Sequence, residues 1–369
     1  MLSAYLIVVY NRITVDRITG LSARHERIPL KEPFEVAKRR AATSDAVLVE
    51  LATAGGVAGF GAAVPVRYVT GESIRSVLSA VRKAAKVLVG RPALDFPSTS
   101  DDLARILPKD SSARAAIEMA LFDAAGKLCG VPSYELFGGA PMSVETDITI
   151  PIVPPDHARE LAARRAAEGF RLFKVKVGSK RPDEDAARAR AVAEAVPAAS
   201  LIVDANQGFR ADQAISFAAQ LRSAGVNIRL FEQPVDKSDL EGLARVSQSV
   251  DVPVFADESA CSPSQVAQLA ASRAVSGVNV KLMKAGILGA LEIAAICQAE
   301  GLQLMLGCML EPRIGITAAL HVACAAGAFL HFDLDGDLLL DQESSGGFIR
   351  QGAWIRPIRA PGLGCPPAP

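Results

Sequence analysis

The sequence lacks an excess of charge of either sign, because 40 lysines and arginines balance 40 aspartates and glutamates over its 369 residues. It also lacks a basic stretch interleaved with aromatic side chains. A surface that binds the phosphate backbone of a nucleic acid concentrates such positive charge. We therefore expect no nucleic-acid partner.

Paired cysteines are missing as well. A disulfide framework or a zinc site is recognised by closely spaced cysteines, for which CxxC is a common spacing. No CxxC pair occurs here, so we predict reduced thiols and a cytoplasmic protein. The six cysteines are scattered along the chain, at Cys129, Cys261, Cys297, Cys308, Cys324 and Cys365.

The start of the chain lacks a hydrophobic run long enough to cross a membrane. Its apolar stretch, 2–10, has nine residues, whereas a spanning helix needs about 20. The stretch also lacks the basic region and the small-residue cleavage site of a signal peptide. We expect it to be a strand or an extension ahead of the folded core, and we expect no membrane partner.

What the sequence does contain is a regular series of charged residues, each closing a short apolar run. Lys176, Asp204, Glu232, Asp257 and Lys281 follow one another at intervals of 28, 28, 25 and 24 residues. A strand, a turn, a helix and a loop need about that much chain, so the period predicts repeated βα units. Burying a charge at a strand end is costly unless the charge is paired or used, so these five are candidates for chemistry.

The same interval continues on both sides of the series. Thr149 lies 27 residues before Lys176, Cys308 lies 27 after Lys281, and Asp335 lies 27 after Cys308. Eight strand ends at this period predict a closed α/β barrel with its active site at the carboxyl ends of the strands. An open doubly wound sheet would need a Gly-rich phosphate loop after an early strand, and none occurs. Ala-rich amphipathic segments between the strands are predicted helices, at 158–167, 185–196, 211–224, 264–274 and 289–300.

The chain is longer than one barrel of about 250 residues requires, so a second module is expected. Ahead of the barrel, an antiparallel meander turning at Gly55-Gly56 is followed by two helices, a pattern typical of an α+β module. We expect an N-terminal module over 1–138, a barrel over 142–340 and a tail over 341–369 that returns to the first module. The predicted strands of the meander are 15–29, 45–53 and 55–65, and the predicted helices are 74–89 and 112–128.

Lys174 and Lys176 are two residues apart on a predicted strand, so both point to the same face. The alternate residues of this strand are apolar, which places the lysines in the barrel interior. Two ammonium groups this close repel each other, and we expect the pKa of one to be depressed so that it can accept a proton. The competing interpretation is that they reach solvent or pair with a helix.

Asp204, Glu232 and Asp257 end three consecutive strands, so their oxygens can surround one ion. An all-carboxylate set selects a hard cation such as Mg²⁺. Asn206 and Glu258 are expected to support these ligands. Helix capping is the competing interpretation of each acid on its own.

Lys281 is expected across the barrel from Lys176, with Lys284 on the next turn. Two bases on opposite sides of one carbanion suit removal of a proton from one face and its return from the other. The pattern therefore predicts a racemase or an epimerase.

The combination KVK, DAN, EQP, ADES and KLMKAG resembles the enolase superfamily, specifically its muconate-lactonizing-enzyme subgroup. The resemblance implies a (β/α)7β barrel with an α+β capping domain formed by the N-terminal module and the C-terminal tail. It implies that Lys176 and Lys281 are the acid/base lysines and that Asp204, Glu232 and Asp257 bind one Mg²⁺ per subunit. KAGI at 284–287 departs from the KAGG that is more frequent in the subgroup, and we expect it to affect loop shape only.

The FDLDG segment resembles the dipeptide epimerases, in which a DxD pair holds the α-ammonium group of the substrate. Asp333 and Asp335 would form that pair here, although helix caps are the competing interpretation. The segment 307–319, GCMLEPRIGITAA, is similar to the same enzymes. Arg39 stands where an Ala-Glu epimerase carries the arginine that binds the glutamate side chain, and Thr149 and Lys174 are expected at the substrate site.

The resemblance implies a dipeptide epimerase that inverts the Cα of the C-terminal residue through an enediolate, on L-Ala-D/L-Glu or a related dipeptide. An N-succinyl amino acid racemase, an o-succinylbenzoate synthase and a muconate-type cycloisomerase are alternatives, as is an inactive barrel used for binding. Substrates without a free amine would leave the DxD pair nothing to bind. Assembly into a homo-oligomer is also expected.

Overall fold

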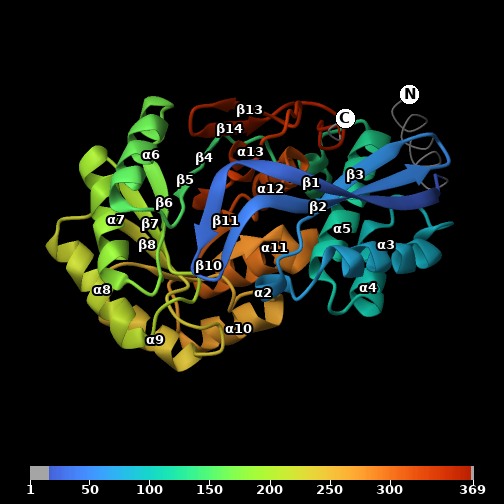
Figure 1. Cartoon of the computed structure of the whole chain (residues 1–369). Coiled ribbons are helices and arrows are strands. Elements are labelled where there is room, and N and C mark those ends of the chain that lie inside the picture. The colour runs from blue at the N-terminus through green and yellow to red at the C-terminus, as the bar shows by residue number, and fades with distance from the viewer. Residues whose placement is uncertain (1–15, 367–369) are drawn as a thin grey trace.

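Eight parallel strands form one sheet that curves into a nearly closed barrel, in the spatial order β5 to β12. The first and last strands meet where Asp147 N donates to Phe332 O at 3.0 Å. The computed structural model describes residues 16–366 (Figure 1), so the expectation for 2–10 falls outside the described residues. The strands are β5 (Ile148–Ile150), β6 (Leu172–Lys176), β7 (Ser200–Asp204), β8 (Ile228–Glu232), β9 (Val254–Ala256), β10 (Gly277–Lys281), β11 (Gln303–Gly307) and β12 (His331–Asp333).

A helix follows each of the first seven strands and covers the outside of the barrel, which confirms the predicted (β/α)7β fold. Two of these helices, α9 and α12, were not predicted, and α11 begins at Leu282 rather than at 289. The helices are α6 (Pro155–Ala167), α7 (Pro182–Ala195), α8 (Ala211–Ser223), α9 (Leu240–Ser249), α10 (Pro263–Ser272), α11 (Leu282–Glu300) and α12 (Arg313–Ala326).

The barrel interior is built in layers, because alternate residues of a strand face the same side. The lower layer is an apolar cluster in which every side chain is buried: Leu172, Ile202, Leu230, Phe255 and Met305. Two positions further along the same strands, the inward side chains are charged or absent: Lys174, Asp204, Glu232, Asp257 and Gly307. An apolar floor therefore supports a charged layer at the carboxyl ends of the strands.

The N-terminal part is a three-stranded antiparallel sheet packed on helices, as the meander pattern predicted. Its first two strands form a long hairpin that extends from the helices over the mouth of the barrel (Figure 1). The elements are β1 (Ile18–Val36), β2 (Arg39–Thr53), β3 (Ala58–Ala63), α2 (Arg67–Thr70), α3 (Ile74–Leu88), α4 (Phe96–Ile106), α5 (Ser111–Cys129) and the 3-10 helix η1 (Ser133–Phe137).

The C-terminal tail runs back across the barrel to helix α5. A short helix, α13 (Gly336–Leu339), leads into β13 (Phe348–Gln351) and β14 (Trp354–Pro357), and β14 pairs with β4 (Val144–Glu145). Beyond this small sheet, Leu363 N donates to Asp123 Oδ1 of α5 at 2.8 Å. The tail therefore joins the N-terminal helices to the barrel.

Among the helices of the described part of the chain, α11 alone is long and apolar enough to cross a membrane by length and composition. It packs against α5 and α10 in the fold, and more than half of its apolar window is buried. Burial against other helices accounts for its apolar composition.

Candidate active site

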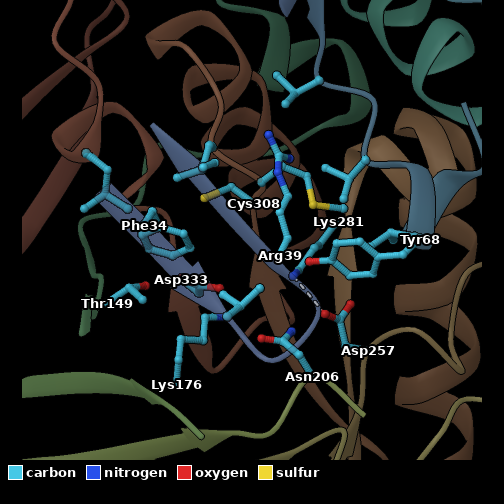
Figure 2. Close-up of a pocket in the computed structure, with 18 of the residues that line it drawn as sticks. Phe34, Arg39, Tyr68, Thr149, Lys176, Asn206, Asp257, Lys281, Cys308 and Asp333 are labelled. Atoms are coloured by element: carbon cyan, nitrogen blue, oxygen red, sulfur yellow. Dashed lines mark hydrogen bonds and ion pairs between the residues drawn. The ribbon is translucent and has the colours of Figure 1, made fainter. Parts of the chain in front are cut away.

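A pocket lies between the charged layer of the barrel and the tip of the β1–β2 hairpin (Figure 2). It encloses about 700 Å³ including its open mouth, a size that suits a small molecule. Barrel residues at strand ends form its floor, and β1, β2 and the segment after β3 form its roof. Of the predicted site residues, it brings together Lys176, Lys281, Asp257, Asn206, Glu258, Asp333, Asp335, Thr149 and Arg39.

Lys174 is completely buried beneath the pocket and contacts three carboxylates. Its Nζ lies 2.7 Å from Asp333 Oδ2, 2.8 Å from Glu232 Oε2 and 3.2 Å from Asp204 Oδ2. Burial acts to lower the pKa of Lys174, but Asp333, Glu232 and Asp204 outweigh it and raise this pKa well above its usual value. Lys174 is therefore not a lysine whose pKa is depressed, as was expected for one of the pair, because three carboxylates surround its ammonium group.

Lys176 and Lys281 reach the pocket from opposite sides of the barrel (Figure 2), since three strands separate β6 from β10 in the sheet order. Lys176 Nζ donates to Asp204 Oδ2 at 2.6 Å, and Lys281 Nζ donates to Asp257 Oδ2 at 2.8 Å. Burial acts to lower the pKa of Lys281, but Asp257 outweighs it and raises this pKa. Each lysine is thus held by one carboxylate, and both amino groups face the space between the two lysines.

Lys284 supports the Asp257 carboxylate from behind. Its Nζ donates to Asp257 Oδ1 and to the Asp257 backbone oxygen, both at 2.6 Å, and to Asn279 O at 2.8 Å. Lys284 is almost completely buried and does not line the pocket. It therefore orients Asp257 rather than meeting a substrate.

Asp204, Glu232 and Asp257 are fully buried at the ends of adjacent strands. The parallel pairing sets Asp204 directly beside Glu232, and β9 places Asp257 next in the ring. Burial and the neighbouring Asp204 raise the pKa of Glu232 to about 7. A divalent cation would offset this crowding of negative charge, and an all-oxygen set of this kind fits Mg²⁺.

Polar side chains beside these acids hold them in position. Asn206 N donates to Asp204 Oδ1 at 2.8 Å, and Asn279 Nδ2 donates to Glu232 Oε1 at 2.8 Å. Asn206 also lies 3.5 Å from Glu258 through Nδ2 and Oε1. Burial, followed by the charges of Asp257 and Asp204, raises the pKa of Glu258 to about 7.

Gln233 organises the next two turns and was not identified from the sequence. Its Oε1 accepts from Asp257 N at 2.8 Å and from Ser259 N at 3.1 Å. Its backbone has a φ of 34°, a conformation that a non-glycine residue rarely adopts. Such strain is typical of functional sites, and here it directs the Gln233 amide toward the strand end that carries Asp257.

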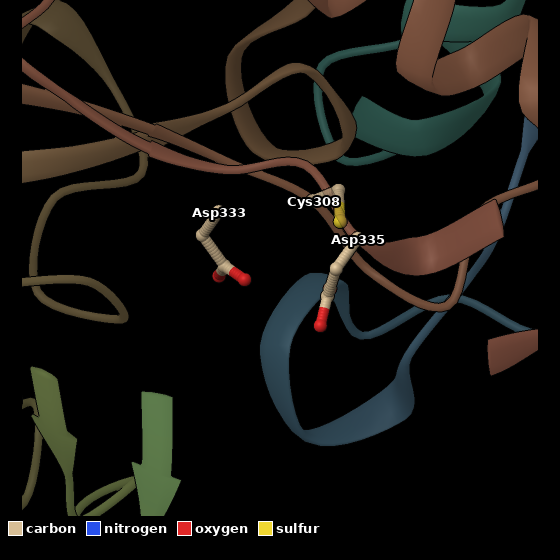
Figure 3. Close-up of side chains that lie close together, drawn as sticks. All are labelled: Cys308, Asp333 and Asp335. Atoms are coloured by element: carbon tan, nitrogen blue, oxygen red, sulfur yellow. The ribbon is translucent and has the colours of Figure 1, made fainter. Parts of the chain in front are cut away.

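Asp333 and Asp335 converge with Cys308 at the carboxyl end of β12 (Figure 3), where the three ligand atoms lie within 4.8 Å of one another. Asp335 stands at the N-cap of α13 but makes no capping bond there. Its Oδ2 instead accepts from Thr149 N at 2.7 Å. Burial and Asp333 raise the pKa of Asp335 to about 6. Burial also acts on Asp333, but Lys174 outweighs it and lowers the pKa of Asp333.

Arg39 enters the pocket from the hairpin tip (Figure 2). The cross-strand pairs Val36↔Arg39 and Phe34↔Ala41 place all four residues on the face toward the pocket. The intervening pair, Glu35↔Arg40, faces away, and Arg40 lies 3.7 Å from Glu35 as an exposed ion pair. The tip is attached to the barrel because Ile152 N donates to Glu35 O at 2.8 Å.

Two further residues at the site were not identified from the sequence. Tyr68 lines the pocket from α2, and burial, followed by the charge of Glu258, raises its pKa. No sequence pattern marks Tyr68. Asp147 lies buried against Asp333 immediately before β5. In the sequence, an acid directly before a short apolar run was the feature that could have identified it.

Comparison with known proteins agrees with this geometry. The family profile described as "Mandelate racemase / muconate lactonizing enzyme, N-terminal domain" matches residues 18–138, and "Enolase C-terminal domain-like" matches residues 157–368. The L-Ala-D/L-Glu epimerase of Bacillus subtilis is 37% identical over 352 residues, which cover 94% of this chain and 96% of that protein.

Solved structures show the same relationship. A substrate-liganded complex of the L-Ala-D/L-Glu epimerase from Bacillus subtilis aligns with a TM-score of 0.93 at 36% identity, covering 96% of this chain and 99% of that one. The dipeptide epimerase of Enterococcus faecalis, complexed with Mg and L-Leu-L-Tyr, aligns with a TM-score of 0.91 at 33% identity over 95% and 99% of the two chains. The chain therefore belongs to the mandelate racemase/muconate lactonizing enzyme family of the enolase superfamily.

Proposed function

We propose that the protein is a Mg²⁺-dependent dipeptide epimerase that inverts the Cα of the C-terminal residue. The observation that carries the proposal is the placement of Lys176 and Lys281 on opposite sides of one pocket that also contains an acidic pair, Asp333 and Asp335. Lys176 and Lys281 are placed to transfer protons on the two faces of one carbon atom. Asp333 and Asp335 are placed to bind a free amino group. The dipeptide epimerases among its relatives support the same function.

The two lysines carry the proton. One lysine, as the free amine, accepts the Cα proton, and the other, as the ammonium ion, returns a proton to the opposite face. Because each faces the pocket from its own side, each serves one epimer. Asp204 and Asp257, which contact the two amino groups, limit where those groups can lie in the pocket.

Asp204, Glu232 and Asp257 are the residues that would hold Mg²⁺. When bound, the ion supplies positive charge at the substrate carboxylate, which stabilises the enediolate that forms as the proton leaves. The residues around the three acids fix them before substrate arrives: Lys284 orients Asp257, Asn279 orients Glu232, and Asn206 orients Asp204.

Asp333 and Asp335 would bind the α-ammonium group of the dipeptide by charge-assisted hydrogen bonds. An N-succinyl amino acid or a muconate offers no cation there, and its own negative charge would be repelled. The buried acidic pair therefore favours a free-amine dipeptide over both alternatives. Thr149 supports this end of the site, since its backbone N–H orients Asp335.

Arg39 favours an acidic second residue in the dipeptide. Its neighbours on the pocket face of the hairpin, Phe34, Val36 and Ala41, are apolar, so the guanidinium is the cation that the tip presents. A guanidinium binds a carboxylate through two parallel hydrogen bonds. We propose L-Ala-D-Glu or L-Ala-L-Glu as the substrate on this basis.

The division of the chain is also part of the proposal, with an N-terminal capping domain over 1–138, the barrel over 142–340 and a returning segment over 341–369. The separate antiparallel sheet of β1 to β3 and the parallel sheet of β5 to β12 support it. The substrate would then be enclosed between two domains, with chemistry on one and side-chain recognition on the other.

Isotope exchange in D₂O tests the proposed function. Incubation with a dipeptide library should introduce deuterium at the Cα of the C-terminal residue of L-Ala-L-Glu, and removal of the metal with EDTA should stop it. Lys176→Ala and Lys281→Ala should each abolish epimerisation and retain exchange with one epimer only, of opposite configuration in the two variants. Exchange of the same epimer by both variants would refute the two-face assignment.

A further inference from the structure

Asp147 is a buried acid with no role in the mechanism above. It is fully buried immediately before β5, and no described residue donates a hydrogen bond to either of its carboxylate oxygens. Its backbone is tied to the far side of the barrel seam, because Asp147 N donates to Phe332 O at 3.0 Å. The preceding Thr146 Oγ1 accepts from Leu334 N at 2.7 Å. The carboxyl group is therefore fixed beside the Asp333–Asp335 segment.

The groups that face Asp147 are two acids and one lysine that is already engaged. Asp333 and Asp335 approach from the end of β12, and Asp333 is within hydrogen-bonding reach. Lys174, from β6, makes its ion pairs with Asp333, Glu232 and Asp204 rather than with Asp147. A buried carboxylate with no cation and no donor is strongly disfavoured, whereas the neutral acid needs one acceptor.

Charge balance in the cluster leads to the same conclusion. If all three carboxyl groups were ionised, three negative charges would lie side by side, and Lys174 is shared between Asp333 and two further acids, Glu232 and Asp204. One retained proton lowers this repulsion and leaves Asp333 and Asp335 able to meet the positive charge of a substrate α-ammonium group. Burial and the charges of Asp333 and Asp335 raise the pKa of Asp147 well above its usual value, which agrees with a neutral acid.

We propose that Asp147 is a positioning residue: it stays a neutral acid and donates its proton in a hydrogen bond to Asp333. This bond orients the Asp333 carboxylate toward the pocket and sets the net charge that the ammonium group of the substrate meets. The inference rests on the proposed function of Asp333 and Asp335 in binding a free amine. It adds Asp147 as the residue that sets the orientation of Asp333 and the net charge of the acidic group.

Infrared difference spectroscopy tests the protonation state without reference to turnover. The Mg²⁺-loaded wild type at pH 7 should show a carbonyl stretch of a protonated carboxylic acid that is missing from Asp147→Asn and shifts in D₂O. The asparagine keeps the shape of the side chain, so the comparison isolates one group. The same protonated-acid bands in both proteins would overturn the inference.

Steady-state kinetics tests the role. Asp147→Val removes the donor and should raise KM for L-Ala-L-Glu by about tenfold, with a smaller effect on kcat. Asp147→Asn, whose amide can donate to Asp333, should recover most of that loss. Asp335→Asn serves as the matched control, since removing an ionised partner of the ammonium group should not be recovered by an amide.

Two outcomes separate this inference from the proposed function. If Asp147→Asn raises KM as much as Asp147→Val, the negative charge of Asp147 is needed and the inference is wrong. If the wild type exchanges no dipeptide, the proposed function is wrong, while the infrared comparison still decides whether Asp147 is a neutral acid.

Discussion

Arg39 and Arg40 are adjacent in the chain but lie on opposite faces of the hairpin tip. Strand alternation sends Arg39 into the pocket and Arg40 to an exposed pair with Glu35. The resemblance to the epimerases pointed to Arg39, with Arg40 next to it in the chain. The register of the hairpin places Arg39 alone of the two at the pocket, which offers a matched pair of substitutions.

Arg39→Ala should reduce kcat/KM for L-Ala-L-Glu far more than for L-Ala-L-Leu. Loss of charge-assisted hydrogen bonds to a carboxylate costs about 1.5 to 3 kcal/mol, or about 10- to 100-fold. Arg40→Ala should leave kcat/KM unchanged for both dipeptides, because the ion pair of Arg40 with Glu35 faces solvent and contributes little to stability. Equal losses for both dipeptides in Arg39→Ala would mean that the arginine does not read the second residue.

At the scale of elements, α11 contains a break that belongs to the site. Gly286 has φ 74° and ψ −173°, a conformation restricted to glycine, and it lies two residues after Lys284. Glu118, from α5, accepts from Ile287 N at 2.5 Å and caps the second part of the helix. A buried acid of the N-terminal part thus fixes the turn that carries Lys284, and through Lys284 it fixes Asp257.

Gly286→Ala should lower both the free energy of unfolding and turnover. The alanine Cβ would meet the Glu118 carboxylate, and the backbone strain alone costs about 1 to 3 kcal/mol. Gly289→Ala is the control in the same helix, because its Cβ would meet only Ala285 Cβ at 3.4 Å. An alanine there should be neutral or stabilising by up to about 1 kcal/mol. Urea unfolding and kcat at saturating substrate measure both effects, and equal stability of the two variants would contradict this account.

The predictability of each element follows from its pattern. The barrel strands were predictable because polar or charged residues recur at a regular interval at or next to their ends, and most of the site residues follow from the same signal. Helix α12 was not predictable, because it is buried on nearly every side from Ile314 to Cys324. Without a polar face, its sequence does not show the alternation of apolar and polar residues that identifies a surface helix. The first turn of α11 was hidden by the break at Gly286.

Residues recruited from outside the periodic pattern could not be foreseen in the same way. Tyr68 comes from a four-residue helix after β3, and nothing in its local sequence indicates that the chain passes over the barrel there. Lys174 was placed on the right face, but its raised pKa was not predicted, because its three carboxylate partners come from strands whose side-chain distances only the folded barrel defines.

At the scale of the whole molecule, a buried histidine joins the barrel to the N-terminal part. His321 of α12 lies 5.1 Å from Tyr134 of η1 between ring centroids, and no described group bonds to either ring nitrogen. Burial lowers the pKa of His321 to about 3. Between that value and the ordinary value near 6.5, the unfolded chain binds a proton that the folded protein excludes.

The folded state should therefore lose stability as the pH falls below about 6.5, at up to about 1.4 kcal/mol per pH unit from this residue. His321→Leu removes the contribution, so its unfolding free energy should gain about 2 kcal/mol relative to wild type between pH 7 and pH 5. Urea unfolding of both proteins across this range measures the difference. If the unfolding free energies of the two proteins changed with pH in parallel, His321 would not take up a proton on unfolding.

The hairpin tip has a consequence for how such an enzyme can diverge. The hairpin residues proposed to meet the distal side chain occupy one short stretch, 34–41, which contains none of the proposed bases or metal-binding acids. A few substitutions there can redirect the protein to a basic, aromatic or apolar dipeptide while the geometry of proton transfer stays untouched. The proposed selectivity therefore lies on the hairpin and the proposed chemistry at the strand ends of the barrel, so substitutions can change one without the other.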